Sequence, residues 1–141
     1  MGKKAMKELE VVAAIIIYKD QILCMQRNKG KYDYVSYKYE FPGGKIELGE
    51  TRAQALQREL REEMALEVAI RDEDFYMTVE HVYPDFKITM HSFICHVTSQ
   101  VFVRKEHVDH KLMTKDELMS LDWAPADIPI VKRLQEDSEC I

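Results

Sequence analysis

The order of hydrophobic and polar residues predicts strands and helices that follow one another along the chain. Residues 9–18 form a nearly continuous apolar run, rich in β-branched side chains, which indicates a strand buried on both faces. The polar residues 19–21 predict a turn, after which residues 22–26 return as the hairpin partner. Residues 75–83 and 87–97 predict a second, longer antiparallel pair that reverses at a proline-containing turn.

Two short polar motifs predict where helices begin. Thr51-x-x-Gln54 is a capping box, in which side chains satisfy backbone N–H groups of the first turn, so a helix should start at Arg52. The buried stripe of this helix repeats at i, i+4 and i+8: Leu56, Leu60 and Met64. A second capping box, Thr114-x-x-Glu117, predicts a short helix over residues 115–120.

A last helix is predicted near the end of the chain. Asp127 is its expected N-cap, and Pro129 lies in the first turn, where proline is tolerated. Its buried residues are expected to be Ile130, Val131 and Leu134. Between the first helix and the second strand pair, Val68 and Ile70 are expected to begin another strand. Elements mixed in this order predict an α/β fold with helices packed on both faces of a mixed sheet.

Two polar segments are expected to be loops. Residues 28–38 contain a glycine and three tyrosines, and they form either a surface loop beside a substrate cleft or a tip without fixed structure. Residues 104–110 contain Glu106 and His107. The five histidines of the chain show no metal-ligand spacing, and most are expected to lie on the surface.

Length, charge and cysteine content exclude several functional classes. A chain of 141 residues is expected to form one domain over residues 1–141, here as a monomer rather than a homodimer. A net charge of -5 argues against a nucleic-acid-binding surface, and no apolar run is long enough to cross a membrane. Cys24, Cys95 and Cys140 show no C-x-x-C spacing, which disfavours a disulfide framework or a zinc site and fits a reducing cytoplasm.

Carboxylates cluster on the first predicted helix. Glu59, Glu62 and Glu63 fall within an arc of roughly 100° on one helix flank. Because like charges at this spacing repel, the cluster is either a solvated face or a site for divalent cations. The spacing G-x5-E-x7-R-E-U-x-E-E, with U an aliphatic residue, decides for the second. It is matched by Gly44, Glu50, Arg58, Glu59, Leu60, Glu62 and Glu63.

This spacing resembles the Nudix box, and the resemblance covers nearly the whole chain. E-F-P-G-G-K at residues 40–45, Arg27, and W-A-P-A-D-I-P-I at residues 123–130 look like the MutT and CTP pyrophosphohydrolase branch of the Nudix hydrolases. The resemblance implies an α/β/α sandwich around a mixed β-sheet. It also implies hydrolysis of a nucleoside triphosphate to a monophosphate and pyrophosphate, often to remove oxidised or modified nucleotides.

One position departs from the box. The family pattern ends E-E-x-G-U, whereas this chain carries Ala65 where a glycine would cap the helix. Alanine adopts the left-handed conformation only with strain, so a slightly different helix exit is expected here.

The resemblance also implies roles for individual residues. The implied metal ligands are the main-chain carbonyl of Gly44 and the carboxylates of Glu59, Glu62, Glu63 and Glu106. Oxygen ligands beside a phosphate substrate indicate Mg²⁺, with Mn²⁺ as a substitute. Arg58 would orient the glutamates and pair with Glu50. The residues implied to contact the substrate are Arg27, Phe41, Lys45, Tyr83 and Asp127. Glu106 is equally consistent with an ordinary surface glutamate, and the glutamate that takes the proton from water stays open.

The base specificity and two other functions also stay open. Asp127 stands where MutT-like members usually carry asparagine, so a strict preference for 8-oxo-dGTP is not expected, and either oxidised or modified nucleotides or cytidine nucleotides are the expected substrates. Tyr83 lies where dinucleoside polyphosphate hydrolases carry a base-stacking tyrosine, although a strand-end aromatic is the simpler interpretation. A non-catalytic nucleotide-sensing or RNA-binding domain is disfavoured because every glutamate of the box is present.

Overall fold

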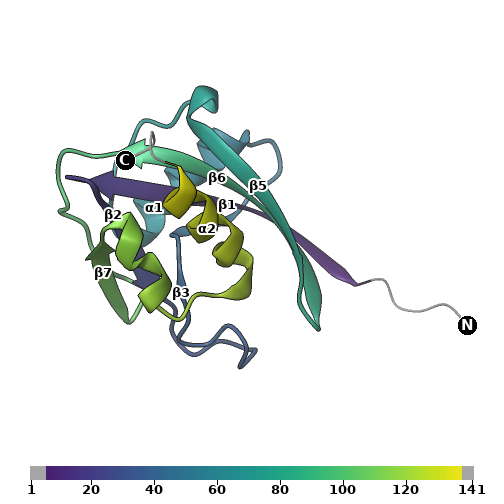
Figure 1. Ribbon diagram of the computed structural model, residues 1–141. Helices are drawn as coiled ribbons and strands as arrows, with labels where there is room; N and C mark the ends of the chain where they lie inside the picture. Colours follow the sequence, from purple (N-terminus) through teal and green to yellow (C-terminus); the bar gives the residue numbers. More distant parts are fainter. Residues whose placement is uncertain (1–5, 138–141) are drawn as a thin grey trace, which may run out of the picture.

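Seven strands form one mixed sheet in the computed structural model, which describes residues 6–137 (Figure 1). The strands are β1 (Lys7–Tyr18), β2 (Gln21–Gln26), β3 (Tyr39–Glu40), β4 (Gly43–Lys45), β5 (Phe75–Val82), β6 (Phe86–His96) and β7 (Asp109–Met113). The main order is β3-β2-β1-β6-β5, while β4 pairs with β1 and β7 pairs with β2. Only β1 and β6 run parallel to each other; the other pairs are antiparallel.

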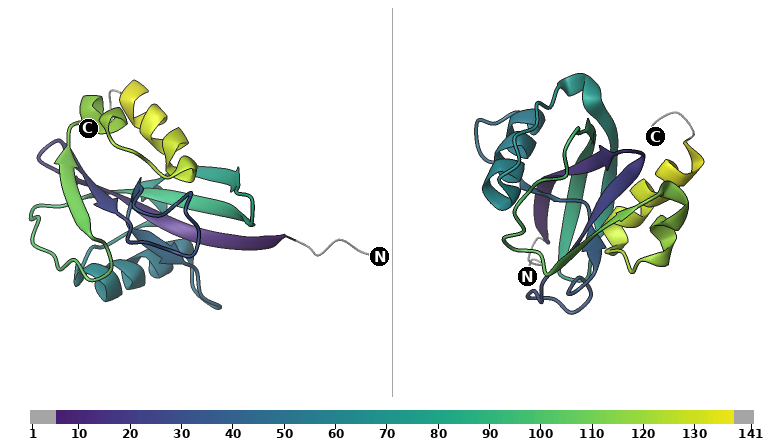
Figure 2. Two further views of the ribbon diagram at one scale, coloured as in Figure 1. Left: turned by 90° about the horizontal axis from the view of Figure 1, so that it is seen from below. Right: turned by 90° about the vertical axis from the view of Figure 1, so that its left-hand side faces the viewer.

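Helices cover both faces of this sheet. Helix α1 (Arg52–Met64) lies on one face, and α2 (Ile128–Glu136) lies on the other, together with the 3₁₀ segments η2 (Lys115–Ser120) and η3 (Pro125–Asp127). Figure 2 shows the sheet between these two layers. A further 3₁₀ segment, η1 (Asp72–Asp74), precedes β5. The predicted α/β/α sandwich is therefore confirmed.

Strand β1 holds the two halves of the core together, as its continuous apolar run predicts. Val12, Ala14 and Ile16 pack in the cluster that includes the buried face of α1. Val11, Ala13, Ile15 and Ile17 belong to the opposite cluster, which contains the buried residues of α2. Full burial of one such aliphatic side chain contributes about 1.5–3 kcal/mol, so this strand is a major source of stability on both faces.

The same strand also brings the glycine-rich turn to the sheet. Residues 11–13 of β1 pair with β4, whereas Ile17 and Tyr18 pair with β2. Gly43 lies so close to β1 that a Cβ atom there would overlap the carbonyl of Val12. The turn can therefore lie flat on β1 and lead directly into the loop before α1.

Helix α1 begins as predicted. The Gln54 N–H donates to Thr51 Oγ1 at 3.1 Å, and the Thr51 N–H donates to Gln54 Oε1 at 2.9 Å, which completes the capping box. The predicted stripe of Leu56, Leu60 and Met64 is fully buried.

The expectation of an altered helix exit is wrong. Ala65 adopts the left-handed conformation, with φ 50° and ψ 36°, that a glycine would adopt there. Its N–H donates to the Arg61 carbonyl at 3.1 Å, and the Leu66 N–H donates to the Leu60 carbonyl at 3.2 Å. The chain thus keeps the usual exit and accepts the backbone strain at Ala65.

Three further expectations need correction. Val68 and Ile70 do not begin a strand, because the Ile70 N–H donates to the Gln57 side chain at 2.7 Å and ties this segment to α1. Strand β7 lies partly in the predicted loop 104–110. The predicted helix 115–120 is a 3₁₀ segment rather than an α-helix, although Glu117 accepts from the Thr114 N–H at 3.0 Å as a capping box requires.

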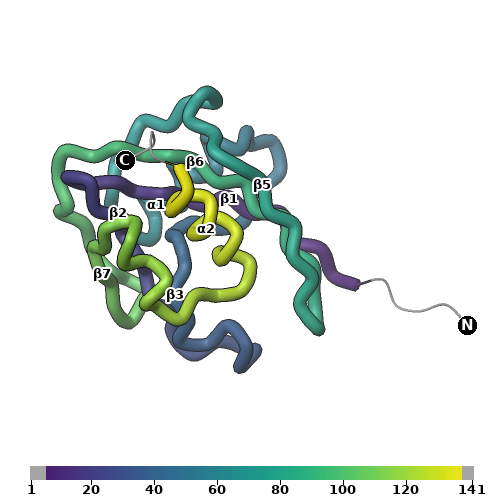
Figure 3. The backbone as a smooth tube through the Cα atoms, viewed as in Figure 1, coloured from purple at the N-terminus to yellow at the C-terminus, as the bar shows by residue number. Residues whose placement is uncertain are grey.

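Residues 27–38 leave β2 as a loop and return into β3 (Figure 3). Tyr34 stacks on Tyr83, with ring centroids 5.3 Å apart, and its hydroxyl donates to Asp85 at 2.8 Å. Tyr32 packs against Phe86 at 5.5 Å. These contacts confirm the surface-loop interpretation. Within residues 6–137, no helix is both long and apolar enough to cross a membrane.

Candidate active site

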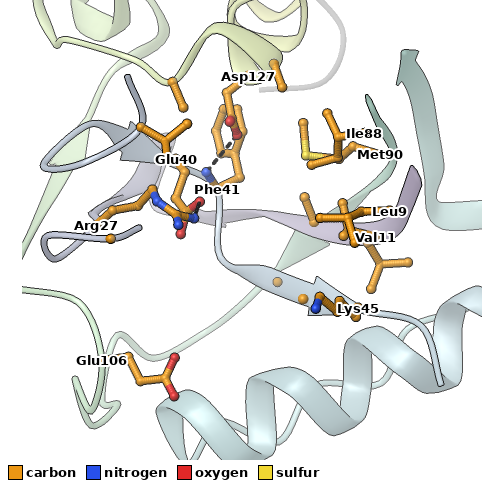
Figure 4. A pocket seen from close by; sticks show the side chains of 18 of the residues that line it. Leu9, Val11, Arg27, Glu40, Phe41, Lys45, Ile88, Met90, Glu106 and Asp127 are labelled. Carbon is orange, nitrogen blue, oxygen red and sulfur yellow. Dashed lines mark hydrogen bonds and ion pairs between the residues drawn. The ribbon is translucent and has the colours of Figure 1, made fainter. Parts of the chain in front are cut away.

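A cavity of about 460 Å³ opens on the sheet beside the glycine-rich turn. Figure 4 shows Arg27, Glu40 and Asp127 at one end, and an apolar wall of residues from β1 and β6 at the other. The wall residues are Leu9, Val11, Ile88 and Met90. Glu106 approaches from a separate segment near α1 (Figure 4). Pockets for nucleotide-sized ligands have volumes of roughly 300–1,000 Å³, so this cavity has a suitable size.

The predicted site residues gather in and beside this cavity. Those that line it are Arg27, Phe41, Gly44, Lys45, Glu63, Tyr83, Glu106 and Asp127. The others form an ion-pair network around Arg58: Glu50, Glu59 and Glu62.

Arg58 is the centre of that network. Its Nε donates to Glu50 Oε2 at 2.6 Å, and its Nη1 donates to Glu59 Oε1 at 2.9 Å and to Glu62 Oε2 at 3.2 Å. Its Nη2 donates to the Lys45 carbonyl at 2.9 Å, which ties α1 to β4. These bonds raise the pKa of Arg58 and lower the pKa of Glu50, in each case chiefly through the hydrogen bonds between the two. The predicted pairing of Arg58 with Glu50 is present.

Gly44 lies directly against the Glu59 carboxylate. A Cβ atom at position 44 would overlap all three atoms of that carboxyl group. Only glycine therefore lets the backbone approach Glu59 so closely, and two of the implied metal ligands become neighbours for this steric reason.

Glu63 lies among other acidic groups. Its pKa is raised to about 8, first by burial and then by the negative charges of Glu106 and Glu59. A divalent cation among these oxygens would relieve that repulsion, and oxygen donors suit hard cations such as Mg²⁺. Among residues 6–137, no three Asp, Glu, His or Cys side chains lie in an arrangement that could hold a metal ion without side-chain movement. Arg58 holds Glu59 and Glu62, so those two side chains must turn to share an ion with Glu63.

The segment that carries Glu106 is anchored at three points. The Val103 N–H donates to the Met64 carbonyl at 2.8 Å, and Lys105 Nζ donates to the Glu62 carbonyl at 3.1 Å. The Val108 N–H donates to the Gln26 carbonyl at 3.0 Å. The segment thus bridges the end of α1 and the end of β2, and this brings Glu106 to the acidic group.

Most histidines were expected to lie on the surface, and two of the five are exceptions. His107 is almost completely buried, with 7% of its side chain exposed, and its Nε2 lies 2.9 Å from Glu40 Oε2. His91 is buried in β6, where its Nδ1 lies 2.8 Å from Thr78 Oγ1. No spacing signal in the sequence marks either residue: His107 contacts Glu40, 67 residues away, and His91 contacts Thr78 across the β5–β6 pair.

Positive charge reaches the cavity from two directions. Arg27 Nη1 donates to Glu40 Oε1 at 3.0 Å, while its buried Nε has no hydrogen-bond partner in the described part of the chain. The Lys45 ammonium forms no ion pair with any residue between 6 and 137 and lies at the cavity wall. Both cations therefore have capacity to bind an anionic ligand.

Asp127 does not cap α2, contrary to expectation. Its carboxylate instead accepts a hydrogen bond from the Phe41 N–H at 3.1 Å, 86 residues away in sequence (Figure 4). The side chain is buried, and its pKa is raised well above the ordinary value by burial, with a smaller contribution from Glu40. Asp127 thus presents a carboxyl group to the cavity from the start of α2.

Two aromatic residues support this end of the cavity. The Tyr83 hydroxyl accepts from the Ala126 N–H at 3.0 Å, and burial raises its pKa to about 12. The Phe41 ring packs against Trp123, with centroids 4.8 Å apart. Both side chains are almost fully buried, so their clearest role is to hold η3 in place, while base stacking by Tyr83 stays a prediction.

The NUDIX domain family matches residues 8–134. The chain belongs to the Nudix family. It is 32% identical to the 8-oxo-dGTP diphosphatase of Escherichia coli K12, over 92% of this chain and 98% of that protein. It is 34% identical to the CTP pyrophosphohydrolase of the same strain, over 90% of this chain and 91% of that protein. The protein is thus a Nudix hydrolase related to diphosphatases of both kinds.

Solved structures of other proteins share the fold of this Nudix hydrolase. The MutT protein from Methanosarcina mazei Go1 superposes with a TM-score of 0.81, over 97% of this chain and 99% of that one, at 18% identity. At this identity the likeness concerns the fold alone.

Proposed function

We propose that this Nudix hydrolase converts a nucleoside triphosphate and water to a nucleoside monophosphate and pyrophosphate, with Mg²⁺ as its metal. One observation carries the proposal. The carboxylates of Glu63 and Glu106 line the same cavity as Arg27, Lys45 and Asp127. Such a cavity offers a metal-binding end, two cations for phosphates and a polar group for a base. The names of the two E. coli relatives support the same reaction.

The chain supplies the groups that such a reaction needs. Gly44, through its carbonyl, and Glu59, Glu62, Glu63 and Glu106 would hold the metal. The bound ion would neutralise phosphate oxygens and lower the pKa of a water molecule. Lys45 and Arg27 offset the negative charge that moves between phosphates. Arg58 fixes the side chains of Glu59 and Glu62 until they bind the ion.

Asp127 is the proposed reader of the base. An ionised carboxylate only accepts hydrogen bonds, so it favours a base with an exocyclic amine such as that of cytosine. When protonated, the same group can also donate to a carbonyl, as on guanine or its 8-oxo form. Because burial raises the pKa of Asp127, the protonated form is favoured more than in an exposed aspartate, which supports oxidised guanine nucleotides as substrates beside cytidine nucleotides.

The remaining parts of the proposal concern the chain as a whole. We propose that residues 1–141 act as one Nudix domain, as a cytoplasmic monomer whose partners are nucleotides rather than nucleic acid or membranes. The net charge of -5 supports the choice of partners, because it disfavours adhesion to polyanions such as nucleic acid. Hydrolysis of a dinucleoside polyphosphate is the second candidate, since Tyr83 lines the cavity.

A substrate panel tests the proposal. Normal, oxidised and methylated nucleoside triphosphates, together with a dinucleoside tetraphosphate, are incubated with the protein and Mg²⁺, and the products are separated by ion exchange. We expect monophosphate and pyrophosphate in equal amounts from a cytidine or an oxidised guanine nucleotide. Release of orthophosphate first, or turnover of the dinucleotide alone, would contradict the proposal.

A further inference from the structure

His107 makes one charged contact at the edge of the cavity. Its Nε2 lies 2.9 Å from Glu40 Oε2, and the ring is shielded from solvent by its surroundings. Since an ionised carboxylate can only accept, Nε2 is the donor. Hydrogen bonds to charged groups are stronger than neutral ones, so this contact fixes both side chains more firmly than packing alone would.

Glu40 connects His107 to Arg27. Its second oxygen, Oε1, accepts from Arg27 Nη1 at 3.0 Å. The backbone beneath this ion pair is itself fixed, because Glu40 pairs with Met25 across the β2–β3 ladder. The Arg27 N–H donates to the Lys38 carbonyl at 2.8 Å. The direction of the Arg27 guanidinium therefore depends mainly on Glu40, and Glu40 depends on His107.

His107 also belongs to the segment that carries Glu106. That segment is anchored to α1 at Val103 and Lys105 and to β2 at Val108. Between the last two anchors lie only Glu106 and His107. The ring contact with Glu40 thus adds a restraint between these two anchors, which helps to keep the Glu106 backbone near Glu63.

We infer that His107 is a positioning residue for the proposed reaction: through Glu40 it orients Arg27, and through its own backbone it places Glu106. This inference rests on the proposed function. One side chain then aligns the phosphate-binding cation with the metal-binding carboxylates, although these groups come from different elements. A misplacement of about 1 Å in such a group can cost roughly 100-fold in rate, so a remote contact of this kind has a measurable effect.

The kinetic test compares His107→Ala with His107→Gln, whose amide N–H can reach the same carboxylate. We expect His107→Ala to lower kcat/KM by roughly 10- to 100-fold and to raise KM, with the Tm close to wild type. His107→Gln should recover most of the loss. The matched control is His96→Gln, since His96 is exposed at the end of β6 and should leave activity unchanged. Equal impairment of the Ala and Gln variants, or unchanged kcat/KM in both, would overturn the inference.

A double-mutant cycle and a measurement without substrate complete the test. If His107 acts through Glu40, adding Glu40→Gln to His107→Ala should lower kcat/KM no further than the worse single variant does, whereas additive losses would overturn the inference. Amide hydrogen exchange of residues 103–108 should accelerate in His107→Ala and in Glu40→Gln, but not in the control variant. Unchanged exchange in the first two variants would also overturn the inference. A wild-type protein that hydrolyses no nucleotide would instead contradict the proposed function, while the exchange result would still decide the restraint.

Discussion

At the scale of single residues, the site consists of a few charged groups held close together. Arg58, with 14% of its side chain exposed, donates hydrogen bonds to three carboxylates, and Gly44 makes room for one of them. The sequence predicted this group because its spacing is fixed along one helix. It could not predict His107, whose partner Glu40 lies 67 residues away and whose polar surroundings give no periodic signal. Asp127 was expected to cap α2, but its carboxylate instead accepts a hydrogen bond from the Phe41 N–H.

Glu63→Gln should separate activity from stability. The amide keeps the shape of the side chain but removes the charge, so kcat should fall by roughly 100-fold or more. In the metal-free protein at pH 9 the same change should raise the Tm, because the amide avoids the repulsion that raises the pKa of Glu63 to about 8. Steady-state kinetics at saturating Mg²⁺ and thermal unfolding in chelator measure the two effects. Glu67→Gln, at the exposed Glu67, serves as the control; near wild-type kcat in Glu63→Gln would refute its role.

Asp127→Asn should make base preference independent of pH. As the pH rises through the raised pKa of Asp127, the carboxylate loses its donor, so the wild-type preference for cytidine over guanine nucleotides should increase. Asparagine keeps a donor and an acceptor at every pH and can still accept from the Phe41 N–H. One mismatched hydrogen bond costs roughly 1–3 kcal/mol, so the kcat/KM ratio at high pH should shift toward guanine by about five- to 150-fold.

The control for this experiment is Asp122→Asn, since Asp122 lies exposed and pairs with Lys38 away from the cavity. Its substrate ratio should follow the wild-type pH curve. A lower Tm for Asp127→Asn together with an unmoved substrate ratio would show that Asp127 only supports Phe41.

At the scale of helices and strands, local chemistry explains most of the boundaries. The capping box fixes the start of α1, and the apolar runs predict β1, β5 and β6 within one or two residues. Strand β7 was missed because the sequence D-H-K-L-M lacks a buried alternating face, and it pairs only because β2 offers a free edge. Val68 and Ile70 have strand-like side chains, yet the hydrogen bond that the Ile70 N–H donates to the Gln57 side chain holds that segment against α1.

Ala65→Gly should stabilise the protein. Ala65 has φ 50°, where an L-residue costs about 1–2 kcal/mol, and part of the gain is offset by the greater freedom of glycine in the unfolded chain. We expect the free energy of unfolding to rise by about 0.5–1 kcal/mol in urea titrations, with kcat unchanged. The matched variant Ala55→Gly, inside α1, should lower it by about 1 kcal/mol or more. A loss of stability in Ala65→Gly would show that the left-handed exit is not strained.

His91 should make β6 sensitive to mild acid. Burial, and to a lesser degree the charge of Arg52, lower the pKa of His91 below 6.5, so the folded protein prefers the neutral ring. Its stabilisation is complete above pH 6.5 and is lost as the pH falls toward the lower folded-state pKa, because the unfolded chain then binds a proton more readily. The decline of Tm between pH 6.5 and 5 should therefore be shallower in His91→Gln than in wild type. His96→Gln, at an exposed position, should follow the wild-type curve.

At the scale of the whole molecule, the site depends on contacts that no local pattern encodes. The parallel pairing of β1 with β6 joins residues 7–17 to residues 86–96 and creates the apolar wall of the cavity. The opposite end comes from η3, whose place is fixed by bonds to Tyr83 and Phe41. Hydrophobic periodicity predicted the strands but not which strands lie side by side in the sheet. This arrangement was therefore expected only from the resemblance to the Nudix family.

We propose that this assembled cavity directs water to one phosphate of a nucleoside triphosphate. Hydrolysis in ¹⁸O-labelled water, with the products analysed by mass spectrometry, identifies that phosphate. Attack at the β-phosphorus predicts one labelled oxygen in pyrophosphate, an unlabelled monophosphate, and no reaction when chelator removes the metal. Label in the monophosphate alone would place the attack at the α-phosphorus, and labelled orthophosphate as the first product would contradict the proposed reaction.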